Sequence, residues 1–355
     1  MVRLREIFLY FLYLGTTGFG GPIALVAYIH RDLVEKKKWI SEEEYREGLA
    51  MATTLPGPIA FQLGIYCGWI QQKFLGGLVA GIAFIITPFF LCVLLGWTYE
   101  KYQFLPWMHS LFYGVSPVVI ALIWNACFQL GKKFLVDKKM WLVTFFCFAF
   151  ALFIKINFIY LLLATGIFGA FSQKAFSKNR LMSLHWPLFV FFFKAGLFIF
   201  GSGLVIVPFL REFVVNQYHW LGEQAFLDSI SVGMISPGPV LITATFVGFL
   251  TERFSGALIA TAGIFLPSFL LVFIGAPILR KYRSNLYLQG FVQWISVAVL
   301  AVIAATSVSL TQKILIDFFS ISIFVISFSV LRWKKIPDPF LVLAGALAGF
   351  LWKLG

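Results

Sequence analysis

Two Pro-Gly-Pro motifs are the residues whose types and spacing are best suited to chemistry. They stand at Pro56-Gly57-Pro58 and Pro237-Gly238-Pro239, inside the apolar stretches 49–71 and 230–251. Because proline lacks an N–H and disfavours helix in the residue before it, each motif predicts a helix break. A helix that restarts after the break has free N–H groups and a positive dipole end, and two such ends at membrane depth would bind an anion. A proline kink in one continuous span is the alternative.

Uncharged polar side chains lie near both motifs. Hydroxyls and amides can donate hydrogen bonds to an oxyanion, and they leave no buried charge when the site is empty. Alternatively, a Ser or Thr in a membrane helix bonds its own backbone. The candidate substrate-binding residues around the breaks are Thr54, Pro56, Gly57, Pro58, Gln62, Ser236, Pro237, Gly238, Pro239, Thr243 and Thr245.

Two glycines and a lysine complete the candidate site. Gly20 and Gly201 lie within FGGP and FGSG, in the apolar segments that open each half of the chain. They permit either close helix packing or a local unwinding beside the breaks. Lys194 is the one charge well inside a predicted span, about 12 Å from its start, where it either attracts an anion or snorkels to the membrane surface. The basic residues that flank the first spans, as interfacial anchors or as an anion funnel, are His30, Arg31 and Arg211.

Composition predicts that membrane helices position these residues. Of the 355 residues 60% are hydrophobic and 12% are charged, against about 25% charged in soluble domains. The apolar residues form long runs, which favours helices over the alternating strands of a barrel. The net charge of +13 is spread in short clusters, a pattern typical of membrane orientation. We therefore expect an all-α polytopic protein of the cell (plasma) membrane, with an anion and the lipid bilayer as partners and no nucleic acid.

The sequence offers no cofactor or metal motif. Its four cysteines lie in apolar segments without CxxC spacing, and its four histidines are dispersed. The 15 acidic residues lie nearly all in predicted loops, without an Asp-rich pair. An enzyme is therefore not expected, and a membrane-embedded transferase, which needs paired acids, is the alternative of a different class.

The chain contains an internal duplication. Residues 19–58 align with 200–239 without a gap, matching Phe-Gly, Trp, Glu and the whole Pro-Gly-Pro. We predict a first repeat at 1–171, a cytoplasmic linker at 172–186 and a second repeat at 187–355. The expected spans are 7–29, 75–98, 105–130, 139–155, 156–171, 187–209, 255–279, 286–311, 317–331 and 337–354.

Charge predicts that the two repeats are inverted. Loop 30–48 carries five Lys or Arg residues, whereas the aligned loop 211–229 carries only Arg211. Since Lys and Arg concentrate on the cytoplasmic side, the two copies are expected to face opposite ways. The resulting scheme has about ten transmembrane helices and two re-entrant Pro-Gly-Pro hairpins, with both termini outside.

These motifs resemble the chromate ion transporter (CHR) family, in its two-repeat form, over nearly the whole chain. The resemblance implies an exporter of chromate, with sulfate as the shape analogue. A carrier for another small oxyanion or an organic anion is the alternative, and a homodimer stays open. The scarcity of intramembrane acids favours export driven by membrane potential without a coupled cation. The segments that carry the resemblance are FGGP (19–22), WISEEE (39–44), LPGP (55–58), FGSG (200–203), PFLREFVV (208–215), SPGPV (236–240), TATFVGF (243–249) and GALIATAGIFLPSF (256–269).

Overall fold

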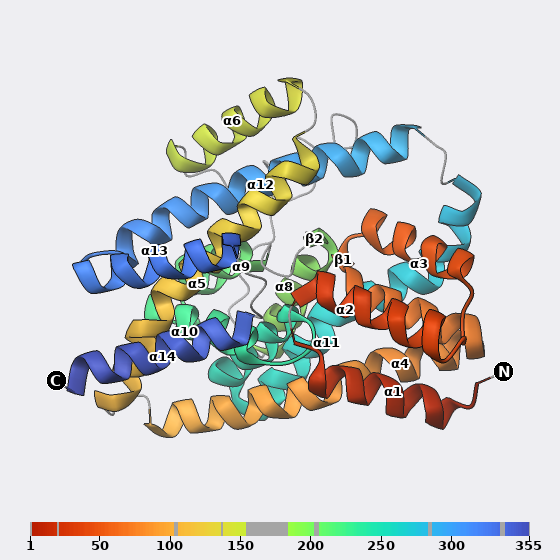
Figure 1. Ribbon diagram of the computed structural model, residues 1–355, viewed down its shortest axis with the longest axis horizontal. Coiled ribbons are helices and arrows are strands. Elements are labelled where there is room, and N and C mark those ends of the chain that lie inside the picture. Colours follow the sequence, from red (N-terminus) through yellow and green to blue (C-terminus); the bar gives the residue numbers. More distant parts are fainter. Residues whose placement is uncertain are drawn as a thin grey trace.

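The computed structural model describes residues 2–19, 21–102, 106–135, 138–153, 184–201, 206–282, 286–333 and 338–354, and nearly all of them are helical (Figure 1). The predicted span 156–171 and most of the predicted linker 172–186 lie outside the described residues. The elements are α1 (Leu4–Thr17), α2 (Gly21–Ile29), the π-helix η1 (His30–Lys36), α3 (Glu42–Thr54), β1 (Gly57–Pro58), α4 (Ile59–Tyr102), α5 (Pro106–Phe134), α6 (Lys138–Phe153), α8 (His185–Phe198), β2 (Phe200–Gly201), α9 (Ile206–Phe209), the π-helix η3 (Leu210–Gln217), α10 (Glu223–Ile235), the 3₁₀ helix η4 (Val240–Ile242), α11 (Thr243–Tyr282), α12 (Leu286–Ile314), α13 (Phe318–Trp333) and α14 (Asp338–Leu354).

The long helices α4 and α11 each fold back on themselves. The backbone leaves helical geometry at Lys73 (φ 52°) and at Arg253 (φ 51°). A Cβ on Gly68 would lie only 2.3 Å from the carbonyl oxygen of Gly76, although eight residues of straight helix rise about 12 Å. Each long helix is therefore a pair of helices joined by a tight turn, and α4 consists of 59–71 and 74–102.

The first Pro-Gly-Pro forms the tip of a helical hairpin, as predicted. α3 leads to the tip, and residues 59–71 of α4 return from it. The two open ends of the hairpin meet, because the Gln71 side-chain amide donates to the carbonyl oxygen of Trp39, just before α3 begins. Midway, the Tyr66 hydroxyl donates to Glu47 at 3.2 Å. At the tip Gly57 has a φ of +132°, which glycine adopts readily and other residues do not. The second motif likewise separates α10 from η4 and α11, with Gly238 at φ +82°.

The segment predicted as one span at 7–29 is instead divided. α1 runs inward from one end of the molecule and ends at Thr17. α2 begins at Gly21 and runs back to the same end (Figure 1). The Tyr10 ring lies 5.7 Å from that of Trp39, and the carbonyl oxygen of Val2 accepts a hydrogen bond from Gln72 at 2.9 Å. The N-terminus therefore lies at the end that carries loop 30–48, and the expectation that it lies at the other end is wrong. Hydropathy missed this because an apolar hairpin of two short helices has the composition of one long span.

The second repeat is divided in the same way. The predicted span 187–209 comprises α8, the strand β2 and the short helix α9, followed by η3. The Phe191 ring lies 5.8 Å from that of Trp220, as Tyr10 does from Trp39 in the first repeat. His185, which begins α8, lies 3.3 Å from Ser255 beside the turn in α11.

Backbone geometry confirms the duplication independently of residue identity. Each described residue with positive φ has a counterpart at an offset of 181 or 180: Gly57 with Gly238, Lys38 with His219, and Lys73 with Arg253. The π-helices η1 and η3 correspond in the same way. Beyond the hairpins, α5 and α12 correspond residue for residue, as do α6 and α13. Each of these helices packs against one from the other repeat: α6 lies against α12, and α13 lies against α5.

The two repeats point in opposite directions along the molecule. The Lys73 turn lies at the start of helix 74–102, which rises roughly 43 Å. The equivalent Arg253 turn lies at the other end of that helix, where Arg253 forms an ion pair with Glu100 at 3.1 Å. α3 therefore enters the molecule from one end and α10 from the other (Figure 1).

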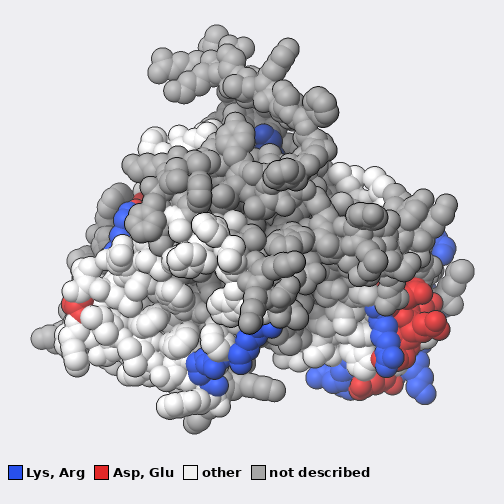
Figure 2. Space-filling view, turned by 90° about the horizontal axis from the view of Figure 1, so that it is seen from above, with Lys and Arg blue, Asp and Glu red and all other residues white. Residues whose placement is uncertain are grey.

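The molecule has the length and surface of a membrane protein. Three stretches among the described residues are long and apolar enough to cross a membrane: Ile59–Tyr102, Ser110–Lys132 and Val240–Gly275. Figure 2 shows acidic and basic side chains gathered chiefly at the right-hand end, where Figure 1 places α1 to α3, and much of the described surface elsewhere without charge. The charge distribution fits a bundle whose sides face lipid.

The turn in α4 provides a stability test. A Cβ at position 76 would lie 2.1 Å from the carbonyl oxygen of Gly68, so Gly76→Ala should push the two helices apart. We expect a loss of about 1–3 kcal/mol in unfolding free energy, measured as a lower Tm of the purified protein in detergent. Gly131→Ala is the matched control, because its Cβ would meet only side-chain atoms at 3.8 and 3.9 Å. Equal Tm values for both variants would contradict the tight-turn geometry.

Candidate functional site

The four broken helix segments meet in two pairs at the centre of the molecule. The N–H of Gly57 donates to the carbonyl oxygen of Ile199 at 2.5 Å, and β1 pairs in parallel with β2, with Pro58 opposite Gly201. The second pair repeats the first, since the N–H of Gly238 donates to the carbonyl oxygen of Gly18 at 3.0 Å. Each Pro-Gly-Pro tip of one repeat is therefore held by the broken opening segment of the other repeat.

The tip at Gly57 is lined by buried polar atoms. A Cβ on Gly57 would lie 2.3 Å from Nε2 of Gln62 and 2.7 Å from Oγ of Ser268. Both side chains are fully buried. Among the described residues, Oε1 of Gln62 and Oγ of Ser268 have no hydrogen-bond partner, and a buried polar atom without a partner costs free energy. The Ser268 hydroxyl can therefore donate a hydrogen bond to a guest that moves these close-packed side chains apart, and we call Gly57, Gln62 and Ser268 the polar cradle.

Gln62 is oriented by its own loop. Its Nε2 donates one hydrogen bond to the carbonyl oxygen of Pro56 at 2.5 Å and carries a second hydrogen. The next residue back, Phe61, is buried and packs against Phe265 and Phe269 with ring centroids 4.7 and 5.5 Å apart. This aromatic contact fixes the start of the returning helix, whose first N–H groups face the tip.

The tip at Gly238 has a different lining. A Cβ there would meet Pro88 Cγ at 3.3 Å and backbone carbonyl oxygens beyond 3.6 Å. Thr243 stands four residues after Pro239 as Gln62 does after Pro58, but its hydroxyl donates to the carbonyl oxygen of Val240 at 2.7 Å. Pro88 occupies the place that Ser268 holds in the other repeat, at an offset of 180. The duplication therefore contains one polar cradle and one largely apolar counterpart.

Several predicted site residues make bonds that serve the fold. The Thr54 hydroxyl donates to the carbonyl oxygen of Ala50 at 2.7 Å. Thr245 pairs with Thr261 at 2.7 Å across the turn in α11. Ser236 donates to the carbonyl oxygen of its neighbour Pro237 at 3.3 Å. Thr54 and Ser236 thus bond nearby backbone, as in the alternative interpretation, whereas Thr245 bonds another side chain.

The glycines and Lys194 fall into different places. Gly201 lies at the first tip through its pairing with Pro58, and Gly20 lies outside the described residues. The segment next to Gly20 is unwound at Gly18, so the unwinding alternative applies there. Lys194 is exposed on α8, which places its side chain on the outside of the bundle and away from the cradle.

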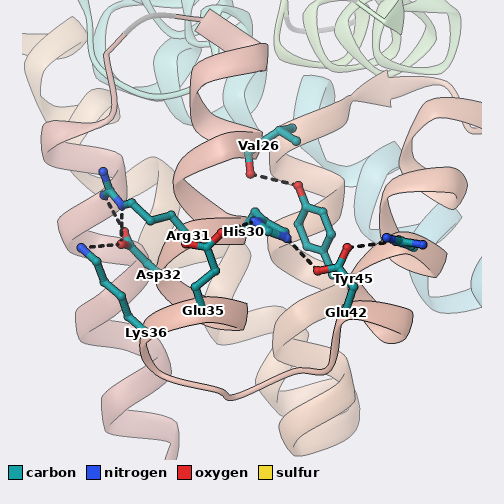
Figure 3. A network of polar contacts seen from close by, with 9 residues as sticks. Val26, His30, Arg31, Asp32, Glu35, Lys36, Glu42 and Tyr45 are labelled. Carbon is teal, nitrogen blue, oxygen red and sulfur yellow. Dashed lines mark hydrogen bonds and ion pairs between the residues drawn. The ribbon is translucent and has the colours of Figure 1, made fainter.

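The basic residues that flank the first spans are engaged in ion pairs. Figure 3 shows His30 between two carboxylates, with Nε2 2.8 Å from Glu42 and Nδ1 3.2 Å from Glu35. Arg31 pairs with Asp32 at 2.9 Å. The hydrogen bond to His30, and then that to Arg46, holds the pKa of Glu42 below its ordinary value. His30 is held by two carboxylates and the charge of Arg31 is neutralised by Asp32, which favours the anchor interpretation over an anion funnel.

The other end of the molecule repeats this pairing. Arg211 pairs with Glu223 at 3.1 Å, and these are the counterparts of His30 and Glu42 at an offset of 181. Lys313 of α12 also bonds Glu223. The entry helix of each hairpin is thus tied at its first residue to the preceding π-helix.

One buried acid was missed in the sequence. Asp228 on α10 is only 2% exposed, and its carboxylate accepts hydrogen bonds from Tyr99 at 2.7 Å and Gln224 at 2.9 Å. The scarcity of buried acids that favoured transport without a coupled cation therefore does not hold. Asp228 aligns with Glu47, and an Asp–Glu match goes unnoticed when only identities are compared. Among the described residues, no three His, Cys, Asp or Glu side chains form a group that could hold a metal ion.

Comparison with known proteins covers both repeats. The chromate transporter family matches residues 5–170 and 186–350. The chromate transport protein of Cupriavidus metallidurans is 38% identical over 98% of this chain and 93% of its own length. The probable chromate transport protein of Synechococcus elongatus is 40% identical over 98% and 95%, and the chromate transport protein of Pseudomonas aeruginosa is 30% identical over 98% and 92%. No solved structure matches the chain.

These similarities run through both Pro-Gly-Pro motifs and both broken opening segments. Because the members of this family are transporters, the transferase alternative is excluded. The chain is a membrane protein that belongs to the chromate transporter family.

Proposed function

We propose that this protein exports chromate, or a sulfate-like divalent oxyanion, from the cytoplasm, and that the polar cradle is its binding site. Its near full-length relatives are named as chromate transport proteins. The observation that carries the proposal is the buried Ser268 hydroxyl without a partner, which lies beside Gly57 together with Nε2 of Gln62. A tetrahedral oxyanion can accept from the Ser268 hydroxyl, the second Gln62 N–H and the N–H groups that begin the returning helix.

An uncharged cradle fits the task of a carrier. Hydrogen-bond donors without net charge bind an anion, yet leave no uncompensated buried charge when the anion departs. A lysine in the same place would hold the anion more tightly and would cost more free energy when empty. The exposed position of Lys194 agrees with this arrangement.

We also propose how the chain lies in the membrane. The two repeats, 1–171 and 187–355, are inverted about the membrane midplane, with loop 30–48 in the cytoplasm of a multi-pass protein of the plasma membrane. The linker 172–186 is expected in the cytoplasm as well, but its described end at His185 lies beside the Arg253 turn, at the end opposite loop 30–48. The opposite ends of the Lys73 and Arg253 turns support the inversion. The hairpins of α1 with α2 and of α8 with α9 would be re-entrant in addition to the two Pro-Gly-Pro hairpins. A homodimer stays a prediction.

The orientation of the loops can be tested by labelling. Lys37 and Tyr218 are exposed counterparts at an offset of 181. Single cysteines from Lys37→Cys and Tyr218→Cys should react with a membrane-impermeant thiol reagent from opposite sides of intact vesicles. The four native cysteines are buried, so the wild-type protein, without an added cysteine, serves as the blank. Labelling of both from the same side would replace the inverted repeat with a parallel one.

The cradle can be tested by filling it. In Gly57→Ala the new methyl group would overlap Gln62 and Ser268, whereas in Gly238→Ala it would press on Pro88 Cγ at 3.3 Å, a much smaller overlap. Both variants carry backbone strain from positive φ, of about 1–2 kcal/mol. We therefore expect Gly57→Ala to lose nearly all chromate flux in proteoliposomes and Gly238→Ala to keep a substantial part. Ser268→Ala and Gln62→Leu each remove one hydrogen bond to a charged group and should cost about 1–3 kcal/mol in apparent affinity. Equal flux in both glycine variants would place the site elsewhere.

Export should be driven by the membrane potential. A charge of minus two gains about 4.6 kcal/mol per 100 mV on leaving a negative interior, enough for a gradient of roughly two thousandfold. Chromate efflux from loaded proteoliposomes should therefore rise strongly when valinomycin and potassium set a negative interior, without pH or sodium gradients. In a parallel measurement, sulfate should compete with chromate for export. Flux that ignores the potential but follows an imposed proton gradient or an exchanging anion would replace this mechanism with coupled antiport.

A further inference from the structure

A buried carboxylate lies between the second tip and the end of the molecule. Asp228 sits on α10 two turns before Ser236, about 12 Å along the helix. Its hydrogen bonds come from the neutral groups of Tyr99 and Gln224. The Tyr99 ring in turn packs against Phe112 of α5 and Phe246 of α11, with centroids 5.7 Å away in both cases. The acid therefore stands where the second hairpin meets helix 74–102.

A cavity lies next to this acid, on the side toward the end of the molecule, and is lined by its neighbours Gln224 and Leu227. It has a volume of about 370 Å³ and is lined by polar groups that include Gln224, Tyr113 and Ser116. Gln224 belongs both to the cavity wall and to the hydrogen bonds of Asp228. The cavity therefore connects Asp228, through one amide side chain, to the end of the molecule opposite loop 30–48.

Several charged groups at this end pair among themselves, while Lys101 lies over the Trp97 and Tyr102 rings, Glu212 accepts from Asn216, and the His219 ring lies against the carbonyl oxygen of Val215. Arg211 of η3 and Lys313 of α12 both bond Glu223, and Arg253 of α11 pairs with Glu100 of α4. Tyr113 of α5 donates to Asp317. The fixed charges around the cavity are thus balanced, while the hydrogen bonds on Asp228 come from neutral donors.

We propose that Asp228 is a proton-binding gate: the divalent anion passes between the second tip and the cavity only while this carboxyl group holds a proton. The proposal rests on the proposed function. An ionised carboxylate about 12 Å away repels a divalent anion through a poorly solvated path, whereas a protonated one does not and still bonds Tyr99 and Gln224. The proton comes from the cavity and returns to it, so no other reactant is needed.

The duplication supplies a matched position at the opposite end. Glu47 on α3 is the counterpart of Asp228 and also accepts a hydrogen bond from a tyrosine, Tyr66, at 3.2 Å. Glu47 is half-buried and belongs to the end that carries loop 30–48. A substitution at Glu47 is therefore the control for effects that belong to one end only.

The test measures flux while the pH on each side is set separately. Everted and right-side-out vesicles containing the full chain take up chromate at a fixed potential, at alkaline pH values where chromate is divalent. With the wild type, flux should fall at least about tenfold as the pH on the cavity side rises. Asp228→Asn keeps the size and an acceptor for Tyr99 but cannot ionise, and its flux should not change with that pH. Glu47→Gln should keep the cavity-side dependence of the wild type.

Tyr99→Phe gives a second, independent reading. Loss of the tyrosine hydrogen bond destabilises the ionised carboxylate, so the fall in flux should move to higher pH on the cavity side. If Asp228 only ties the hairpin to α4, Tyr99→Phe lowers flux at every pH without moving the midpoint, and Asp228→Asn keeps the wild-type pH profile; either result overturns the gate. Should Asp228→Asn lower the Tm too far to be measured, the midpoint in Tyr99→Phe decides. Absence of chromate flux in the wild type itself would instead overturn the proposed function.

Discussion

The exchange of backbone hydrogen bonds between the repeats is the constraint on which the rest of the structure depends. In lipid, a broken helix needs protein partners for its N–H and C=O groups because no water can supply them. Gly57 finds its partner at Ile199 and Gly238 finds its partner at Gly18. Each break therefore exists only because a matching break in the other repeat faces it. The paired breaks, in turn, bring the buried polar side chains of Gln62 and Ser268 to the centre.

Divergence within this symmetric frame gives the two tips different linings. The backbone features of the two copies coincide at nearly every special position, yet Ser268 of one copy corresponds to Pro88 of the other. The frame is maintained by geometry that both copies share, such as the tight turns with glycine contacts. The side chains that face each tip are then free to differ.

Much of the arrangement could be predicted from residues that act locally. Pro-Gly-Pro dictates a break wherever it falls, because the missing N–H groups are a property of proline itself, and its recurrence indicates a duplication. Ser268 could not be predicted, since its role comes from lying beside Gly57, far away in the sequence, and nothing in its neighbourhood marks it. The folding of 7–29 into α1 and α2 was also beyond reach, because hydropathy measures composition and not direction. Asp228 was missed for a third reason. The predicted apolar stretch began at residue 230, so Asp228 fell in a predicted loop although it lies within α10.

The interlocked tips also bear on how the protein is made. The N–H of Gly57 has to wait for Ile199, and the segment around Gly18 has to wait for Gly238. At about 5–20 residues per second, a ribosome needs several seconds or more to produce the missing half. During that interval the first repeat sits in the translocon or the bilayer with its breaks unsatisfied. It must therefore be shielded by water, lipid headgroups or an insertion factor, and release of the first half before the second is complete would trap the chain in an incomplete state.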